Sequence, residues 1–196
     1  MNRQDAYSFL VRVAIPKVKK RARIPTFLNN ESNLLWDSIY RAHLDVLSGR
    51  FHLPLYCERG NNGINEITIA LYNELNEHNN TVPIIPRTII QEFSERNNVE
   101  FGAIQKLVNM TFKYLSILKT YHAFDDSNRD LNFSPDNCDC PLDSIILGLI
   151  SDEYNGHSWT NMSFEEYSEA QSIISNRMNH DSNLLFDFRN YQDLNI

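Results

Sequence analysis

Lys106 and Asp143 are the two side chains whose types and positions could perform covalent chemistry in this chain of 196 residues. Lys106 follows Gly102 closely and lies among apolar residues near the start of a long helical pattern. Partial burial and a helix N-terminus both disfavour an ammonium group. A free amine can attack an electrophilic carbon and form a Schiff base, so Lys106 is a candidate nucleophile.

Asp143 follows Lys106 by 37 residues and comes directly after Pro141-Leu142, where another helix is expected to begin. A carboxylate at a helix N-terminus is stabilised as the anion. It could orient a nucleophile or stabilise a positively charged, sugar-like transition state. The simpler alternative is that Lys106 extends to solvent and Asp143 only caps its helix.

Other kinds of site have weak support in the sequence. Cys138 and Cys140 form a single C-x-C pair, whereas a zinc site needs a second pair or suitably spaced histidines, so we expect no metal. The sequence has no glycine-rich phosphate-binding loop and no G-x-S-x-G motif, and we expect no cofactor. Three cysteines are too few for a disulfide scaffold, which favours a reducing, cytoplasmic compartment.

The apolar pattern around these residues is helical. Apolar side chains recur at helical spacing, and only six residues are glycine. Ser163 and Glu166 form a capping-box pattern at the start of one segment. We expect an all-α fold with helices over 32–48, 64–78, 87–96, 103–121, 144–151 and 163–178, and a last one from about 182.

The expected organisation is a single helical domain over residues 1–196, which can divide into two lobes. Residues 1–86 would form an N-terminal helical lobe with a basic arm, and residues 87–196 a lobe with the candidate site. The polar stretch 123–140 is expected to be a mobile loop. No apolar run approaches the roughly 20 residues of a membrane-spanning helix, so we expect no membrane partner.

Charge is distributed unevenly along the chain. Residues 1–25 carry seven basic side chains and one acidic one, whereas residues 126–196 carry three basic and thirteen acidic ones. The net charge is −7, which disfavours non-specific binding to nucleic acid because that binding depends on neutralising phosphates. A local basic arm can still contact phosphates.

The segment Val99–Lys106 resembles the hairpin and catalytic-helix start of helix-hairpin-helix DNA glycosylases. It is most similar to the archaeal-type 8-oxoguanine glycosylase/lyases, in which a Gln-Lys pair opens an apolar helix. Their Pro-x-Asp motif is matched by Pro141-Leu142-Asp143. The tail is similar as well, and the resemblance covers about residues 87–192.

This resemblance implies a hairpin-like turn before a central apolar helix, with Lys106 as Schiff-base nucleophile and Asp143 as catalytic carboxylate. The implied activity is excision of an oxidised purine from damaged double-stranded DNA, followed by strand cleavage, with no cofactor. We expect DNA contacts from Asn97, Asn98, Gly102 and Gln105, together with the basic arm 17–23.

Two other interpretations stay open. The first is a catalytically idle relative that binds a protein or nucleic acid, favoured by the acidic C-terminal half and by a hairpin with one glycine, Gly102. The second is an unrelated helical interaction module, in which Lys106 and Asp143 would lie far apart. The distance between the Lys106 amine and the Asp143 carboxylate separates this second interpretation from the others.

Overall fold

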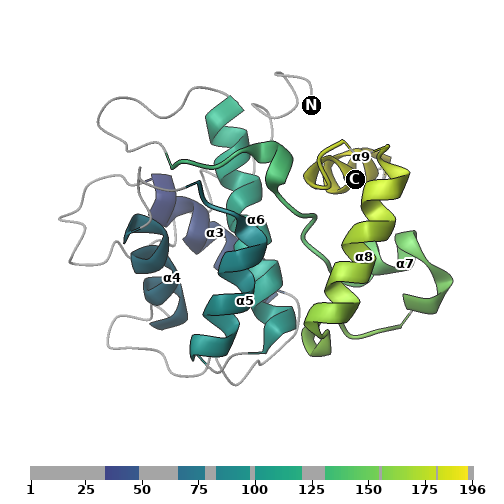
Figure 1. The fold of residues 1–196 in the computed structure, drawn as a ribbon, viewed down its shortest axis with the longest axis horizontal. Helices are drawn as coiled ribbons and strands as arrows, with labels where there is room; N and C mark the ends of the chain where they lie inside the picture. The colour runs from purple at the N-terminus through teal and green to yellow at the C-terminus, as the bar shows by residue number, and fades with distance from the viewer. Residues whose placement is uncertain are drawn as a thin grey trace. The chain divides into compact units, whose positions relative to one another are not determined.

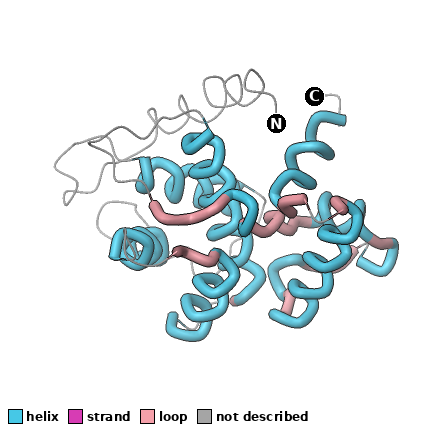
Figure 2. The backbone as a smooth tube through the Cα atoms, turned by 45° about the horizontal axis from the view of Figure 1, so that its top comes forward, coloured by secondary structure: helices cyan, strands magenta, loops and turns pink. Residues whose placement is uncertain are grey.

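The structure is a computed structural model that describes residues 34–48, 66–77, 83–97, 100–120, 131–154, 156–179 and 181–193. Within these ranges the chain forms seven α-helices and no strand, which confirms the all-α fold (Figure 2). The basic arm and the expected helix boundaries at Ser32 and Gly49 lie outside the described residues.

The helices follow the periodicity of the sequence to within about two residues at each end. Their bounds are α3 Leu34–Ser48, α4 Glu66–Glu77, α5 Pro86–Asn97, α6 Phe101–Thr120, α7 Ser144–Ile150, α8 Phe164–Arg177 and α9 Leu184–Asp193 (Figure 1). Three short 3₁₀ helices lie between them: η4 Pro135–Asn137, η5 Asp152–Tyr154 and η6 Trp159–Asn161.

The chain divides into two units, and the boundary between them falls within α6. The first unit contains Met1–Pro83 and Tyr114–Asn132, and the second contains Ile84–Lys113 and Phe133–Ile196. The lobes expected from the sequence, 1–86 and 87–196, differ from these units because the end of α6 groups with the N-terminal part of the chain.

In the first unit, α3 packs against α4 through aromatic side chains. Trp36 is 1% exposed, stacks on Tyr40 with ring centroids 6.1 Å apart, and meets the edge of Tyr72 at 5.8 Å. Edge-to-face and offset contacts of this kind add to the free energy of simple area burial. Trp36 is therefore a core residue, as its position on the apolar stripe of its helix predicts.

In the second unit, α6 supplies the central core. Its apolar side chains are buried on several faces, and Ile104, Leu107 and Phe112 are fully inaccessible. The helix begins at Phe101, so Gly102 is a helical residue. The sequence pattern had instead predicted that Gly102 ends a turn and that the helix starts at Ala103. Among the described residues, no helix combines the length and the apolar character needed to span a membrane.

Two further helices of the second unit, α7 and α8, lie side by side (Figure 1). The expected capping box at the start of α8 is present. The Ser163 hydroxyl accepts a hydrogen bond from the Glu166 backbone N–H, and the Glu166 carboxylate accepts one from the Ser163 backbone N–H. These bonds satisfy two backbone donors that the helix itself leaves unpaired.

The expectation of a mobile loop over 123–140 is wrong for its second half. Leu131 and Phe133 are buried, and the Phe133 ring meets Phe112 edge-on at 5.1 Å. Cys138 and Cys140 are buried free thiols. Residues 131–140 are mostly polar, but their few apolar side chains are buried and hold this segment in the core.

A buried imidazole makes the stability of the first unit sensitive to acid. Burial lowers the pKa of His43 to about 4, and its Nδ1 lies 3.2 Å from the Thr68 hydroxyl. The unfolded chain binds a proton near pH 6.5, whereas the folded protein resists protonation until about pH 4. The free energy of unfolding should therefore fall as the pH drops from about 6.5 to 4, by up to about 3 kcal/mol.

Urea denaturation of the parent protein and of His43→Gln between pH 4 and 8 tests this prediction. The difference between the two stability curves isolates the imidazole from the carboxylates that also titrate in acid. The variant should lose less stability on acidification than the parent. Parallel curves would contradict a neutral, buried His43.

Candidate active site

The candidate site depends on an extended backbone segment, residues 138–143, that enters the core of the second unit. A helix or sheet would normally satisfy such buried peptide groups, and here a glutamine side chain does so. Gln171 of α8 donates to the Cys140 carbonyl at 2.7 Å and accepts from the Cys140 N–H at 3.1 Å. The Asn183 amide donates to the Gln171 side-chain oxygen at 3.1 Å and so orients it.

A second glutamine repeats this arrangement two residues later. Gln105 of α6 donates to the Leu142 carbonyl at 2.8 Å and accepts from the Leu142 N–H at 3.2 Å. Both glutamines are fully buried. The two side chains thus take the place of a neighbouring strand and fix the backbone that leads into Asp143.

Asp143 is the N-cap of α7. Its Oδ1 accepts hydrogen bonds from the backbone N–H groups of Ile145 and Ile146, both at 3.0 Å. Burial acts to raise the pKa of Asp143, but the charge and hydrogen bond of Lys106 and these two backbone bonds outweigh it. The net effect lowers the pKa of Asp143 below its ordinary value, so the carboxylate is ionised at neutral pH.

The other carboxylate oxygen of Asp143 forms an ion pair with Lys106, the candidate nucleophile. Lys106 Nζ donates to Asp143 Oδ2 at 2.8 Å, and the two side chains are 12% and 15% exposed. The amine also lies 5.0 Å from the centre of the Trp159 ring, within the range of a cation–π contact. The structure therefore brings together the two residues that the sequence analysis singled out, at the edge of the core.

Gly102 allows η6 to approach α6 closely. A Cβ atom at this position would lie 2.0 Å from the Trp159 carbonyl oxygen and 2.5 Å from that of Thr160. Only a residue without a side chain fits against this backbone. Gly102 thereby brings Trp159 over the Lys106 amine, a role that the sequence analysis did not foresee.

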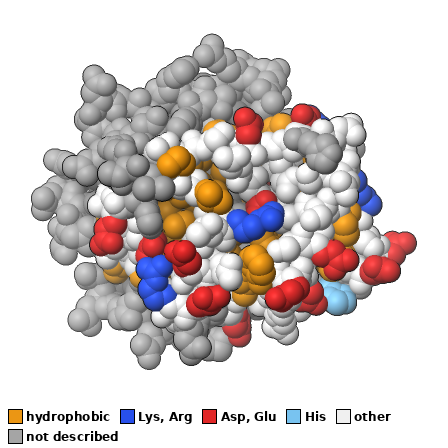
Figure 3. Space-filling model, in the orientation of Figure 1, with side chains coloured by type: hydrophobic (Ala, Val, Ile, Leu, Met, Phe, Trp, Pro, Cys, Tyr) orange, Lys and Arg blue, Asp and Glu red, His pale blue; other side chains and the backbone are white. Residues whose placement is uncertain are grey.

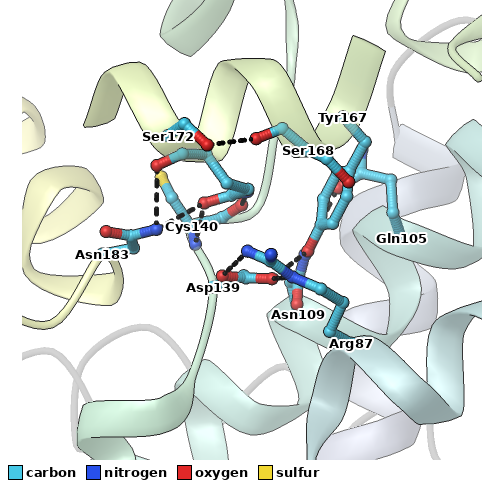
Figure 4. A network of polar contacts seen from close by, with 10 residues as sticks. Arg87, Gln105, Asn109, Asp139, Cys140, Tyr167, Ser168, Ser172 and Asn183 are labelled. Atoms are coloured by element: carbon cyan, nitrogen blue, oxygen red, sulfur yellow. Dashed lines mark hydrogen bonds and ion pairs between the residues drawn. The ribbon is translucent and has the colours of Figure 1, made fainter. Parts of the chain in front are cut away.

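A second polar network is built around Asp139 of the same extended segment (Figure 4). Arg87 of α5 forms two hydrogen bonds with Asp139, both at 2.8 Å, and Tyr167 donates to the same carboxylate at 2.8 Å. Asn109 donates to the Tyr167 hydroxyl at 2.9 Å and so joins the network to α6. Burial and the Asp139 charge raise the pKa of Tyr167 well above its ordinary value, so the phenol stays neutral.

The other residues expected to contact DNA are placed as follows. Asn97 ends α5 and donates to the Phe93 carbonyl at 2.8 Å, and Asn98 lies outside the described residues. Gly102 and Gln105 are both buried and make the contacts given above. Their contact with DNA stays a prediction.

The structure also shows an open pocket of about 340 Å³, lined by His157, Ser158, Asn161, Met162 and Glu166. Neither Lys106 nor Asp143 lines it. Among the described residues, no three His, Cys, Asp or Glu side chains gather in a way that could hold a metal ion.

Sequence reasoning missed Gln171, Trp159, Arg87 and Asp139. Gln171 lies within the apolar pattern of its helix. A polar side chain at such a core position is the one sequence signal that could have predicted its structural role. The other three act through contacts between distant segments, which no local pattern reveals.

Replacing Gly102 with alanine should lower the free energy of unfolding by about 2 kcal/mol, since the new methyl group meets backbone that cannot rotate away. Gly148 of α7 is the matched control, because a Cβ there meets nothing within 4 Å. Gly148→Ala should stabilise the protein by up to about 1 kcal/mol. Thermal unfolding measures both changes, and equal effects would contradict the close approach at Gly102.

Replacing Gln105 with methionine should lower the free energy of unfolding by about 3 kcal/mol, because the Leu142 N–H and carbonyl both lose this partner while the side-chain volume is kept. Gln91→Met on the exposed face of α5 is the control and should change stability by less than about 0.5 kcal/mol. Denaturant titration compares the two variants. A Gln105→Met protein as stable as the control would show that the segment does not depend on this amide.

Comparison with known proteins identified no relative of this chain. No family model matches the chain, and no curated protein and no solved structure matches it either.

Proposed function

We propose that the chain is a DNA base-excision enzyme, a glycosylase/AP lyase that removes an oxidised purine through a Schiff base on Lys106. The contact between Lys106 Nζ and Asp143 Oδ2 at 2.8 Å is the observation that carries the proposal. The resemblance to helix-hairpin-helix glycosylases requires these two side chains to meet, although 37 residues separate them.

The surroundings of Lys106 suit a nucleophilic amine. The side chain is mostly buried, the Trp159 ring covers one side of it, and the hydrogen bond to Asp143 Oδ2 holds its amine in position. The Asp143 carboxylate is itself held by two backbone N–H groups, so it keeps its position during the reaction. Such fixed polar groups lower the reorganisation needed in a transition state.

The proposed reaction uses these two groups and water, which hydrolyses the final imine and frees the Lys106 amine. A damaged nucleotide is turned out of the duplex, and the Lys106 amine forms a bond to its C1′ atom. The N-glycosidic bond breaks, and its electron pair leaves with the base, which takes up a proton. Opening of the sugar ring gives a protonated imine, and loss of a C2′ proton then breaks the C3′–O bond. The Asp143 carboxylate stabilises the positive charge that develops on the sugar.

A catalytically idle binding protein is the second candidate, and the surface charge favours it. On the face shown in Figure 3, Asp and Glu side chains are scattered over the described surface, and Lys and Arg side chains are few. Residues 126–196 carry thirteen acidic and three basic side chains. Such a surface weakens the attraction to phosphates on which DNA affinity usually depends.

Borohydride trapping separates the two candidates. The protein is mixed with duplexes that contain 8-oxoguanine or an abasic site, reduced with borohydride and run on a denaturing gel. We expect a covalent band that Lys106→Gln abolishes. Lys119→Gln, which removes another amine of α6, should leave the band unchanged.

Asp143→Asn is the matched test of the carboxylate. Asparagine is also a good N-cap, so the variant should keep α7 while it loses the charge that faces Lys106. We expect trapping to slow by about 100-fold or more. No band with either duplex, from a protein shown by circular dichroism to be folded, would remove the lyase proposal and favour the binding role.

A further inference from the structure

The open pocket at the start of α8 is a second candidate site in the described part of the chain. Its volume of about 340 Å³ lies at the lower end of the range for small-molecule sites, and neither Lys106 nor Asp143 lines it. Of its lining residues, His157 and Ser158 precede η6, and Glu166 belongs to the first turn of α8. A ligand of this pocket must match the hydrogen-bonding groups that these elements present.

A short chain of hydrogen bonds determines which groups η6 offers to a ligand. The Thr160 hydroxyl donates to Asn161 Oδ1 at 3.3 Å, which fixes the orientation of the Asn161 amide. A hydroxyl has one proton, so the Ser158 hydroxyl, 2.6 Å from that of Thr160, must be the donor in the bond between them. Ser158 Oγ therefore keeps lone pairs for an incoming donor, and Asn161 keeps its NH₂ group for an incoming acceptor.

Glu166 adds a second acceptor, and the capping box of α8 holds it in place. Its Oε2 accepts a hydrogen bond from the Ser163 backbone N–H at 2.8 Å. Its Oε1 accepts no hydrogen bond from another described residue, so this oxygen is left for a ligand. The pocket thus presents two acceptors, Ser158 Oγ and Glu166 Oε1, and one donor group, the NH₂ of Asn161.

The charges at the pocket favour a neutral ligand. Glu166 is the one acidic side chain among the lining residues, which include no lysine or arginine, so an anion is repelled. Glu165, exposed in the same helical turn, adds to this repulsion. A cation is disfavoured by the partial positive charge of the α8 N-terminus, where Glu166 is the third helical residue.

The other two lining residues suit a flat ring. His157 is exposed, its imidazole meets the edge of the Tyr154 ring with centroids 5.9 Å apart, and its backbone N–H donates to the Tyr154 carbonyl at 3.0 Å. Gly156, with a φ of 86°, makes the turn between them. Met162 supplies a thioether, which packs favourably against aromatic rings. Nucleobases commonly stack on imidazole rings while polar groups bind their edges.

We propose that this pocket binds the guanine ring of a neutral nucleoside. Along its Watson–Crick edge, guanine has one acceptor, O6, and two donors, N1–H and the 2-amino group, which complement the NH₂ of Asn161 and the two acceptors Ser158 Oγ and Glu166 Oε1. Adenine, cytosine and uracil each have only one donor group on that edge. The inference goes beyond the proposed lyase and does not rest on it, because the pocket has its own set of residues.

Isothermal titration calorimetry of the full-length protein with four nucleosides and one cation tests the choice of ligand. We expect guanosine to bind and inosine, which lacks the 2-amino donor, to bind about 10-fold more weakly. Adenosine and uridine should bind about 100-fold more weakly than guanosine or not at all. Agmatine, a guanidinium without a ring, should not displace guanosine.

Two variants of α8 test the residues. Glu166→Gln should weaken guanosine binding about 10-fold or more, because it removes the charged acceptor, while glutamine still completes the capping box and keeps the helix start. Glu165→Gln is the matched control, since it makes the same charge change in the same turn at a residue that does not line the pocket. It should leave the affinity within about 2-fold of the parent. Circular dichroism checks that both variants are folded.

Three results would overturn the inference: no binding of guanosine by the folded parent, equal affinity for guanosine and adenosine, or an unchanged affinity in Glu166→Gln. Binding of agmatine without guanosine would also overturn it and assign the pocket to an organic cation. Lys106→Gln should bind guanosine as the parent does. A failed borohydride experiment with guanosine binding present would therefore remove the lyase function and leave the pocket assignment intact.

Discussion

The second unit depends on how one stretch of buried backbone satisfies its hydrogen bonds. The peptide groups of Cys140 and Leu142 have Gln171 and Gln105 as partners, and each primary amide supplies one donor and one acceptor. An ionised carboxylate could not serve both groups of one residue in this way, because it has no donor for the carbonyl. The chain can therefore cross the core in extended form without a neighbouring strand, and it reaches α7 with Asp143 in the N-cap position.

The fixed backbone has an electrostatic consequence. It brings two carboxylates inward, Asp139 toward Arg87 and Asp143 toward Lys106. Breaking such a pair by removing one partner is costly, because the remaining charge stays buried, even where the intact pair adds little to stability. These ion pairs therefore act more on the precision of the arrangement than on the free energy of folding.

The sequence predicted the helices because each carries a continuous apolar stripe, and it predicted the α8 capping box because that motif is local. It did not predict that α6 begins at Phe101, since a glycine in the first turn usually marks a boundary. Packing against the carbonyls of η6 overrides that propensity at Gly102. The meeting of Lys106 and Asp143 followed from family resemblance, since no spacing rule brings residues of two such segments together.

The failures have a common physical origin. The average composition of residues 123–140 predicts a mobile loop, whereas Leu131, Phe133 and the two buried cysteines decide where residues 131–140 lie. Gln105 and Gln171 look like surface residues until the backbone that they bind is known. A contact between segments that are distant in sequence depends on the whole fold, so a local pattern can suggest the parts of such a site but not its assembly.

The pairing of charges also constrains the chemistry that the site could perform. Lys106, Lys113 and Arg87 are each neutralised by an aspartate, so these cations contribute little attraction for phosphate. An amine held against a carboxylate is better suited to a reaction in which positive charge appears on the substrate. In the proposed reaction, the Asp143 carboxylate stays a fixed anion beside Lys106 and would stabilise a cationic sugar more than a neutral one. Under the proposed function, such a site would act on the transition state rather than on the DNA backbone, so an acidic chain and chemistry on a nucleic acid are compatible.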